Sequence, residues 1–289
     1  MKSLTLTSRH NTPLTYFKTG QGPVIVLANA YGVATRMWDG VIKALAPEHT
    51  IIIWELRGIE NADKPSADFE FTVEEHALDL AEILRAEQIE SAHCVAWCSG
   101  AKVALRHLHD FPGVLTSLQF ISGNFTPFAR NPSCQSEWDE KMLAATTLLL
   151  QNPAATPFFH DAIKTAIDAV MRGDNNVQGG RFGLLKMIRP EYISLMLQPM
   201  FNESTVVNYL TMINAYYRYD VSALLEDLHI PLCFLWSEDD HISHPEQSRI
   251  LSDSFATVRA IQVPDSNHYM LIEKPDLIAR HIAEFVSSL

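Results

Sequence analysis

Short runs of β-branched residues alternate with amphipathic stretches along the first third of the chain, and this alternation limits the possible folds more than any other feature. Buried strands are expected at residues 24–28, 50–54 and 94–97. Residues 72–84 begin with a threonine followed by a glutamate at capping-box spacing, which predicts a helix. Parallel strands joined by crossover helices produce this order. The sequence therefore predicts an α/β fold with a mostly parallel, twisted sheet flanked by helices.

The middle of the chain has a different pattern. Residues 127–228 are rich in Leu, Met, Phe and Tyr, and their spacing is typical of helices interrupted by short loops. Strand-like sequence returns at residues 230–236 and 258–263. We therefore expect one core formed by residues 1–126 and 229–289, with residues 127–228 inserted into it as a helical lid.

Composition disfavours several classes of partner. The 289 residues include 22 basic and 34 acidic side chains, and the net charge of −12 disfavours binding to nucleic acids or anionic membrane surfaces. No stretch of about 18 uninterrupted apolar residues could span a bilayer, and residues 1–7 lack the apolar core of a signal peptide. The four cysteines form neither a disulfide framework nor paired C-x-x-C metal sites. We expect a cytoplasmic protein that acts on a small molecule; its oligomeric state is left open.

Residues 95–101, with the sequence VAWCSGA, have the small-x-nucleophile-x-small pattern of a turn between a strand and a helix. This turn is sharp, so small residues must flank the nucleophile on both sides. The pattern places Cys98 at the nucleophile position. A register one residue later would make Ser99 the nucleophile, but Trp97 would then occupy a position that requires a small side chain.

A cysteine at this turn would lie at the N-terminus of a helix, where partial positive charge favours the thiolate. Lys102, one helical turn later, would add positive charge. The alternative is that Cys98 is an ordinary buried cysteine. We accept that interpretation for Cys94, which lies within the preceding strand.

A nucleophile of this kind requires an acid and a histidine, which on this fold follow it along the chain in that order. Asp240 lies in the loop after a buried strand, and His268 follows the next strand. Asp239 is the alternative acid, because sequence alone does not separate neighbouring carboxylates. His241 and His244 have H-x-x-H spacing, but no cluster of further ligands accompanies them, so we expect no metal site.

Together these segments resemble the α/β-hydrolase superfamily over nearly all of the chain outside the lid. Residues 54–58 and 62–65 resemble the family's D-x-R-G-x-G-x-S-x-x-P stretch, and residues 89–96 resemble the approach to its nucleophile turn. Asp240 takes the place of the acid in G-x-x-D, and His268 that of the histidine in G-x-x-H-x-x-x-x-E-x-P. The resemblance implies the α/β-hydrolase fold and a Cys-His-Asp triad, with cysteine in place of the usual nucleophilic serine.

The oxyanion hole of this fold uses two backbone N–H groups. One would come from Ser99, directly after the nucleophile. The other would come from Tyr31 in the loop of residues 29–32, which reads Asn-Ala-Tyr-Gly where related enzymes have H-G-x-G. Asn29 either fixes this loop by hydrogen bonding or shapes the pocket. We expect Asn29, Tyr31 and Trp97 to contact the substrate.

A cysteine nucleophile would form a thioester with an acyl group, and a thioester remains reactive toward amine, hydroxyl or thiol acceptors. We interpret the chain as a cysteine-dependent acyl-transfer enzyme, a thioesterase or acyltransferase, without a cofactor. Its substrate would be a hydrophobic acyl or polyketide-like thioester on coenzyme A or a carrier protein. The alternatives are an ester, lactone or carbon–carbon bond hydrolase, and a non-catalytic ligand-binding protein that retained the fold. The bulky apolar side chains of the lid suit an apolar substrate: Phe158, Phe159, Phe182, Leu184, Leu185, Met187, Ile188, Met196, Leu197, Met200 and Phe201.

Overall fold

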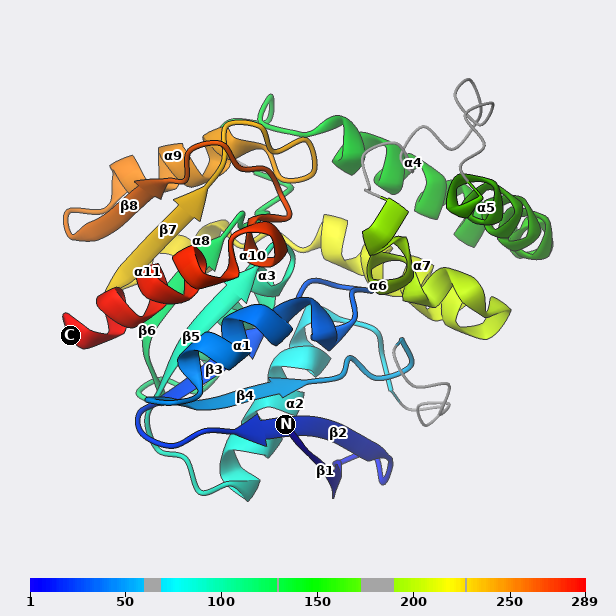
Figure 1. Cartoon of the computed structure of the whole chain (residues 1–289). Helices are drawn as coiled ribbons and strands as arrows, with labels where there is room; N and C mark the ends of the chain where they lie inside the picture. The colour runs from blue at the N-terminus through cyan, green and yellow to red at the C-terminus, as the bar shows by residue number, and fades with distance from the viewer. Residues whose placement is uncertain (60–68, 129, 173–189, 227) are drawn as a thin grey trace.

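Eight strands form one sheet in the order β1-β2-β4-β3-β5-β6-β7-β8 (Figure 1). The computed structural model describes residues 1–59, 69–128, 130–172, 190–226 and 228–289. All pairs from β4 to β8 are parallel, which confirms the expected mostly parallel sheet. The strands are β1 (Lys2–Thr7), β2 (Pro13–Thr19), β3 (Val24–Ala28), β4 (Thr50–Trp54), β5 (Ala92–Trp97), β6 (Leu115–Ile121), β7 (Leu232–Trp236) and β8 (Val258–Gln262).

The central strands are buried on both faces because helices cover both. Between Ile25 and Ala28, β3 has no solvent-exposed residue, and the same is true of Ile51 to Ile53 in β4. Parallel strands between two helical layers have continuous apolar sequences of this kind. The β-branched runs in the sequence therefore predicted the centre of the sheet correctly.

The antiparallel strands β1 and β2 were not predicted from the sequence. They form a hairpin at one edge of the sheet, and β2 pairs with β4. In β2, Leu14 and Tyr16 face the core, and the residues between them are more exposed. An edge strand with one solvated face has this period of two, which is a weaker signal than a continuous apolar run.

Two pairs of helices cover the two faces of the sheet. In Figure 1, α1 and α11 lie together on one face, and α2 and α3 lie together on the other. The expected N-terminal cap of α2 is present, because the Thr72 hydroxyl accepts a hydrogen bond from the Glu75 N–H at 3.2 Å. The bounds are η1 (Thr35–Trp38), α1 (Asp39–Leu45), α2 (Val73–Ala86), α3 (Gly100–Asp110), α8 (Ser222–Glu226), α9 (Pro245–Ser254), α10 (Met270–Glu273) and α11 (Pro275–Ser287).

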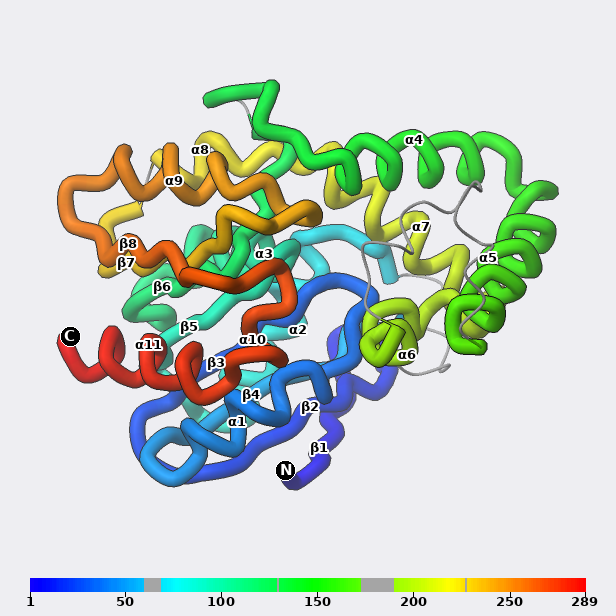
Figure 2. The backbone as a smooth tube through the Cα atoms, turned by 45° about the horizontal axis from the view of Figure 1, so that its top comes forward, coloured from blue at the N-terminus to red at the C-terminus, as the bar shows by residue number. Residues whose placement is uncertain are grey.

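A helical segment is inserted between β6 and β7. Its helices group on one side of the molecule (Figure 2), beyond the strand ends that carry the site. The loop-like residues 173–176 and 178–180, the apolar side chains between 182 and 188, and residues 62–65 lie outside the described residues. No helix of the described segments is long and apolar enough to cross a membrane. The inserted elements are α4 (Glu137–Gln151), η2 (Pro153–Ala155), α5 (Thr156–Met171), η5 (Pro190–Tyr192), α6 (Ile193–Met196), η6 (Gln198–Phe201) and α7 (Glu203–Arg218).

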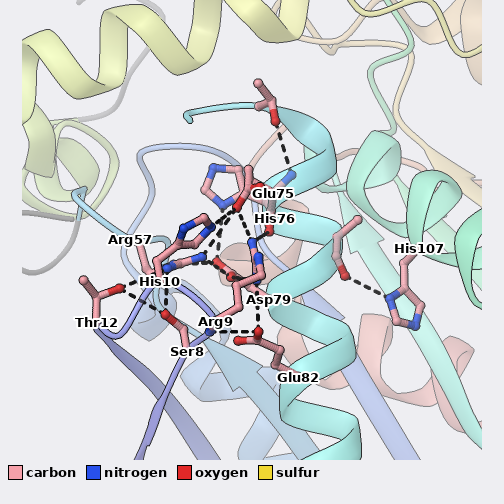
Figure 3. Close-up of polar contacts among 12 residues, drawn as sticks. Ser8, Arg9, His10, Thr12, Arg57, Glu75, His76, Asp79, Glu82 and His107 are labelled. Atoms are coloured by element: carbon pink, nitrogen blue, oxygen red, sulfur yellow. Dashed lines mark hydrogen bonds and ion pairs between the residues drawn. The ribbon is translucent and has the colours of Figure 1, made fainter. Parts of the chain in front are cut away.

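A buried ion pair joins the end of β4 to α2 (Figure 3). The Arg57 guanidinium donates to both carboxylate oxygens of Asp79, with an Nε–Oδ2 distance of 3.0 Å, and to the hydroxyls of Ser8 and Thr12 at 3.0 and 3.1 Å. Arg9 donates to the same carboxylate at 3.0 Å. Arg57, within the stretch that resembles the family motif, therefore ties the β1–β2 turn to the sheet and to α2.

Candidate active site

Cys98 lies at the tip of the turn between β5 and α3. Its φ of 51° lies in the left-handed region, which non-glycine residues seldom adopt. The next residue, Ser99, already has helical backbone angles and forms the N-cap of α3. The structure therefore places Cys98, and not Ser99, at the strained position of a nucleophile elbow.

The elbow requires glycine two residues after Cys98. A Cβ atom at Gly100 would lie 2.2 Å from the carbonyl oxygen of Ala28 and 2.9 Å from that of Asn29. These atoms belong to the backbone at the end of β3, so they cannot move without disturbing the sheet. The small residue in the sequence pattern is thus explained by the close packing of α3 on β3.

We expect Gly100→Ala to lower the unfolding free energy by about 1–3 kcal/mol, because the added methyl group overpacks this contact, and to reduce activity by displacing the elbow. Urea denaturation and an esterase assay measure the two effects. Gly113→Ala is the control for activity, since a Cβ there would meet no atom within 4 Å; its φ of 92° makes alanine strained, so this variant should lose stability but keep full activity. Equal activity in both variants would contradict the steric role assigned to Gly100.

His268 and Asp240 meet at the carboxyl ends of β8 and β7. The His268 Nδ1 lies 3.0 and 2.9 Å from the two carboxylate oxygens of Asp240. Burial opposes protonation of the imidazole, but the negative charges of Asp240 and Cys98 and hydrogen bonds to both outweigh it, so the pKa of His268 is raised. The site therefore favours the protonated, positively charged form of His268.

The structure distinguishes between the two candidate acids. Asp240 is 5% exposed, and its Oδ1 accepts backbone N–H groups of Ile242 and Ser243 at 2.9 and 2.8 Å. Asp239 is exposed and makes a backbone bridge to Asn267. These backbone hydrogen bonds fix the Asp240 carboxylate toward the histidine, and Asp239 takes no part.

The H-x-x-H pair has a structural use. His244 caps α9, where its Nδ1 accepts the N–H of Glu246 at 3.3 Å, and His241 is exposed. Among the described residues, no group of three or more His, Cys, Asp or Glu side chains is placed to hold a metal ion.

Asn29 fixes the loop after β3. Its amide donates to the Val33 carbonyl at 2.6 Å, and its carbonyl oxygen accepts the Trp38 indole N–H at 2.9 Å. Asn29 does not line the cavity described below. Of its two expected roles, loop fixing is the one seen in this structure, because both polar groups of its side chain are used within the loop.

The backbone N–H of Tyr31 donates to the Ser99 hydroxyl at 2.8 Å. This amide was expected to serve the oxyanion hole, and donors of a hole lie about 3 Å from the position of the oxyanion. The Ser99 Oγ therefore occupies the place near this amide that a substrate oxygen would take. Ser99 contributes a hydroxyl to this corner of the site as well as the amide at the start of α3.

A cavity of about 50 Å³ opens at Cys98 and His268. Trp97 lies beside it with its ring centroid 5.3 Å from that of His268. Of the lid side chains expected to cover a substrate, Met196 lines the cavity and Phe158 is 77% exposed. Six of the fifteen residues that line the cavity are aromatic: Tyr31, Trp97, Trp138, Tyr209, Tyr216 and Tyr217.

Two buried charged residues hold the inserted helices against the site. The Lys102 ammonium donates to the carbonyls of Tyr216 and Tyr219, at the end of α7, both at 2.7 Å. Its hydrogen bonds are thus to α7 and to the loop after β6, and burial lowers the pKa of Lys102, which weakens the positive charge expected from it near Cys98. Asp139 of α4 accepts from Asn124 at 2.7 Å and from the Tyr217 hydroxyl at 3.0 Å. Asp139 also forms the capping box of α4 with Ser136, whose N–H donates to it at 3.2 Å. The S-x-x-D spacing is a local signal for this cap, but the contacts with Asn124 and Tyr217 come from distant segments.

The strand order, the elbow after β5 and the acid and histidine after β7 and β8 define a protein of the α/β-hydrolase class. A family model described as alpha/beta hydrolase fold matches residues 23–275. The chain belongs to this family. Two solved structures share the fold across nearly the whole chain. An esterase from Rhodococcus sp. ECU1013 has a TM-score of 0.72 at 20% identity and covers 100% of both chains. An enol-lactonase from Burkholderia xenovorans LB400 has a TM-score of 0.71 at 16% identity and covers 98% of this chain and 100% of that chain.

The sequence relatives match either nearly the whole chain at low identity or only part of it. A putative carbamate hydrolase, RutD, of Pseudomonas savastanoi is 20% identical over 268 residues, which is 92% of this chain and 94% of that protein. An uncharacterized protein of Mycobacterium bovis is 32% identical over 103 residues, or 36% of this chain. The match spans only 30% of the length of that mycobacterial relative.

Proposed function

We propose that this protein is a cysteine-dependent acyl-transfer hydrolase with Cys98 as nucleophile, His268 as general base and acid, and Asp240 as the orienting acid. One observation carries the proposal: His268 is hydrogen bonded to a buried carboxylate and lines the same cavity as a thiol on a strained turn. A nucleophile, a base and a group that orients the base form the set required for covalent acyl transfer.

The proposed reaction has two halves. The Cys98 thiolate attacks the acyl carbonyl, and the leaving alcohol or thiol takes the proton from the His268 imidazolium. The resulting thioester is then attacked by water or another acceptor, which gives its proton to His268 as the carbon–sulfur bond breaks. The Tyr31 and Ser99 backbone N–H groups would stabilise the oxyanion in both halves, once the Ser99 hydroxyl has left the Tyr31 amide.

The cavity narrows the range of acyl groups. A volume of about 50 Å³ is small compared with pockets of about 300–1,000 Å³ for drug-sized ligands. We therefore favour a short or flat acyl group over the long hydrophobic or polyketide-like chain expected from the lid sequence. An aromatic wall suits a flat substrate, because aromatic side chains provide large rigid faces.

Hydrolysis of an oxygen ester or lactone is the second candidate. The same catalytic set attacks an ester carbonyl as well as a thioester. The solved relatives include proteins named as an esterase and an enol-lactonase. Paired acetyl oxygen ester and acetyl thioester substrates compare the two directly: a higher kcat/KM with the thioester favours the thioesterase, and a higher kcat/KM with the ester favours this second candidate.

The test is the identity of the acylated residue. Incubation with p-nitrophenyl acetate and intact-mass analysis should show one acetyl adduct on the wild-type protein, lost in Cys98→Ala and kept in Ser99→Ala. Cys94→Ala is the matched control: burial raises the pKa of the Cys94 thiol to about 12, so this buried thiol should not be acylated and the variant should keep the adduct.

Either of two outcomes contradicts the proposal. An adduct kept in Cys98→Ala and lost in Ser99→Ala would make Ser99 the nucleophile. No adduct and no turnover with esters, lactones or thioesters would favour the non-catalytic ligand-binding protein.

A further inference from the structure

Ser243 contacts both the nucleophile and the acid of the site. It lies three residues after Asp240, in the loop before α9, and is 2% exposed. Its backbone N–H donates to Asp240 Oδ1 at 2.8 Å. Its hydroxyl donates to the Cys98 sulfur at an Oγ–Sγ distance of 3.5 Å. No motif in the sequence singled out this residue.

We propose that the Ser243 hydroxyl is a further catalytic group, which donates a hydrogen bond to the Cys98 sulfur whenever that sulfur carries negative charge. The inference rests on the proposed function of Cys98 and adds a residue to it. The hydroxyl gives up no proton, so the proton balance between His268, leaving group and acceptor is unchanged.

The hydroxyl is held in place by its own backbone. Because the N–H groups of Ile242 and Ser243 are both bound to Asp240, the loop that carries the hydroxyl cannot move without breaking hydrogen bonds to the acid. A donor fixed before the reaction loses little conformational freedom when charge develops. A hydrogen bond to a charged acceptor is also stronger than one to a neutral acceptor.

The role of Ser243 differs between the steps. Before the attack, the hydroxyl stabilises the sulfur when it carries negative charge. After acyl transfer the sulfur is neutral and the hydrogen bond weakens. When the carbon–sulfur bond breaks, its electron pair returns to the sulfur, and the hydroxyl again stabilises the developing charge. Release of the acyl group should therefore depend on Ser243.

Other titratable groups also face the sulfur, and their charge must stay the same in the proteins that a test compares. His268 lies next to it from the loop after β8 and is held by Asp240, and Tyr209 and Tyr216 approach it from α7. Burial raises the pKa of both tyrosines, with the charge of Cys98 adding to the effect. They therefore stay neutral through the neutral pH range.

The test measures the rate at which iodoacetamide alkylates Cys98 as a function of pH. Intact-mass analysis detects the adduct in wild type and in Ser243→Ala. Below the midpoint of the profile we expect the variant to react about tenfold more slowly, because it loses a hydrogen bond to a charged group and less of its thiol is ionised. Above the midpoint of the profile the variant should react as fast as wild type or faster, since a less stabilised thiolate is more nucleophilic. A merely structural effect would not produce this crossover.

Three variants serve as controls. Ser252→Ala removes a buried hydroxyl of α9 that donates to the Arg249 carbonyl at 2.9 Å. This variant should leave the profile unchanged. Ser243→Thr keeps the hydroxyl and should react like wild type, whereas Ser243→Val has the same shape without it and should react like Ser243→Ala. If Ser243→Ala does not fold, the comparison of Ser243→Thr with Ser243→Val, which have the same shape, shows whether the hydroxyl affects the reactivity of Cys98.

The two proposals fail in different ways. If Cys98 of the folded wild type does not react faster than the same thiol in urea, the proposed function is overturned and this inference with it. If Cys98 is reactive and the Ser243→Ala and Ser243→Val profiles match wild type, only the role of Ser243 is overturned.

Discussion

Replacing His268 by alanine is expected to lower kcat/KM for an acyl ester by about 10³–10⁴-fold, because the site loses both the base that activates the thiol and the acid that protonates the leaving group. Asp240→Asn should reduce activity through His268, since an amide would favour the wrong tautomer of the imidazole. Steady-state kinetics with a chromogenic acetyl ester measure both effects.

The control for this prediction is the neighbouring carboxylate. Asp239→Asn changes an exposed side chain that takes no part in the site, so its kcat/KM should stay close to wild type. The effects of His268→Ala and Asp240→Asn should also be far from additive, because the two residues act as one unit. Additive losses, or a large loss in Asp239→Asn, would show that the acid is assigned incorrectly.

The largest expected effect on stability comes from Asp79→Ala. The Asp79 side chain is fully buried, and Arg57, with which it pairs, is 6% exposed (Figure 3). Removing Asp79 leaves the buried Arg57 guanidinium with the Glu75 carboxylate 3.9 Å away as its nearest remaining ion-pair partner among the described residues, which should cost about 3–5 kcal/mol. Urea denaturation followed by circular dichroism should show this loss in unfolding free energy.

A surface ion pair provides the comparison. Asp110 pairs with Arg106 one turn earlier on α3, at 2.7 Å, with 21% of the Asp110 side chain exposed. Asp110→Ala should cost less than about 1 kcal/mol, as is usual for pairs in contact with water. The double variant Asp79→Leu with Arg57→Met should be more stable than Asp79→Ala, because it removes both buried charges. A loss below about 1 kcal/mol in Asp79→Ala would contradict the assignment.

The parts of the fold that depend on local sequence were predicted well. The central strands and the Thr72 cap of α2 both follow from patterns within a few residues. The hairpin of β1 and β2 was not predicted, because an edge strand with one solvent-exposed face has only a weak alternating pattern.

The candidate site divides in the same way. The elbow at Cys98 is a local feature, since small residues around one position already predict a sharp turn. The sequence also shows the order in which an acid and a histidine follow later strands, and this order favoured Asp240 and His268. Sequence could not distinguish between Asp240 and Asp239, because the direction in which each of two adjacent loop side chains points depends on the tertiary structure.

The sequence by itself thus determined the fold class, the elbow and the order of the catalytic candidates, because each depends on residues close together in the chain. Only the tertiary structure decided the contact of Ser243 with Cys98, 145 positions away, the bond from Tyr31 to Ser99 and the ion-paired role of Asp79. Local periodicity does not encode such contacts, since they form where the carboxyl ends of parallel strands and the inserted helices pack together.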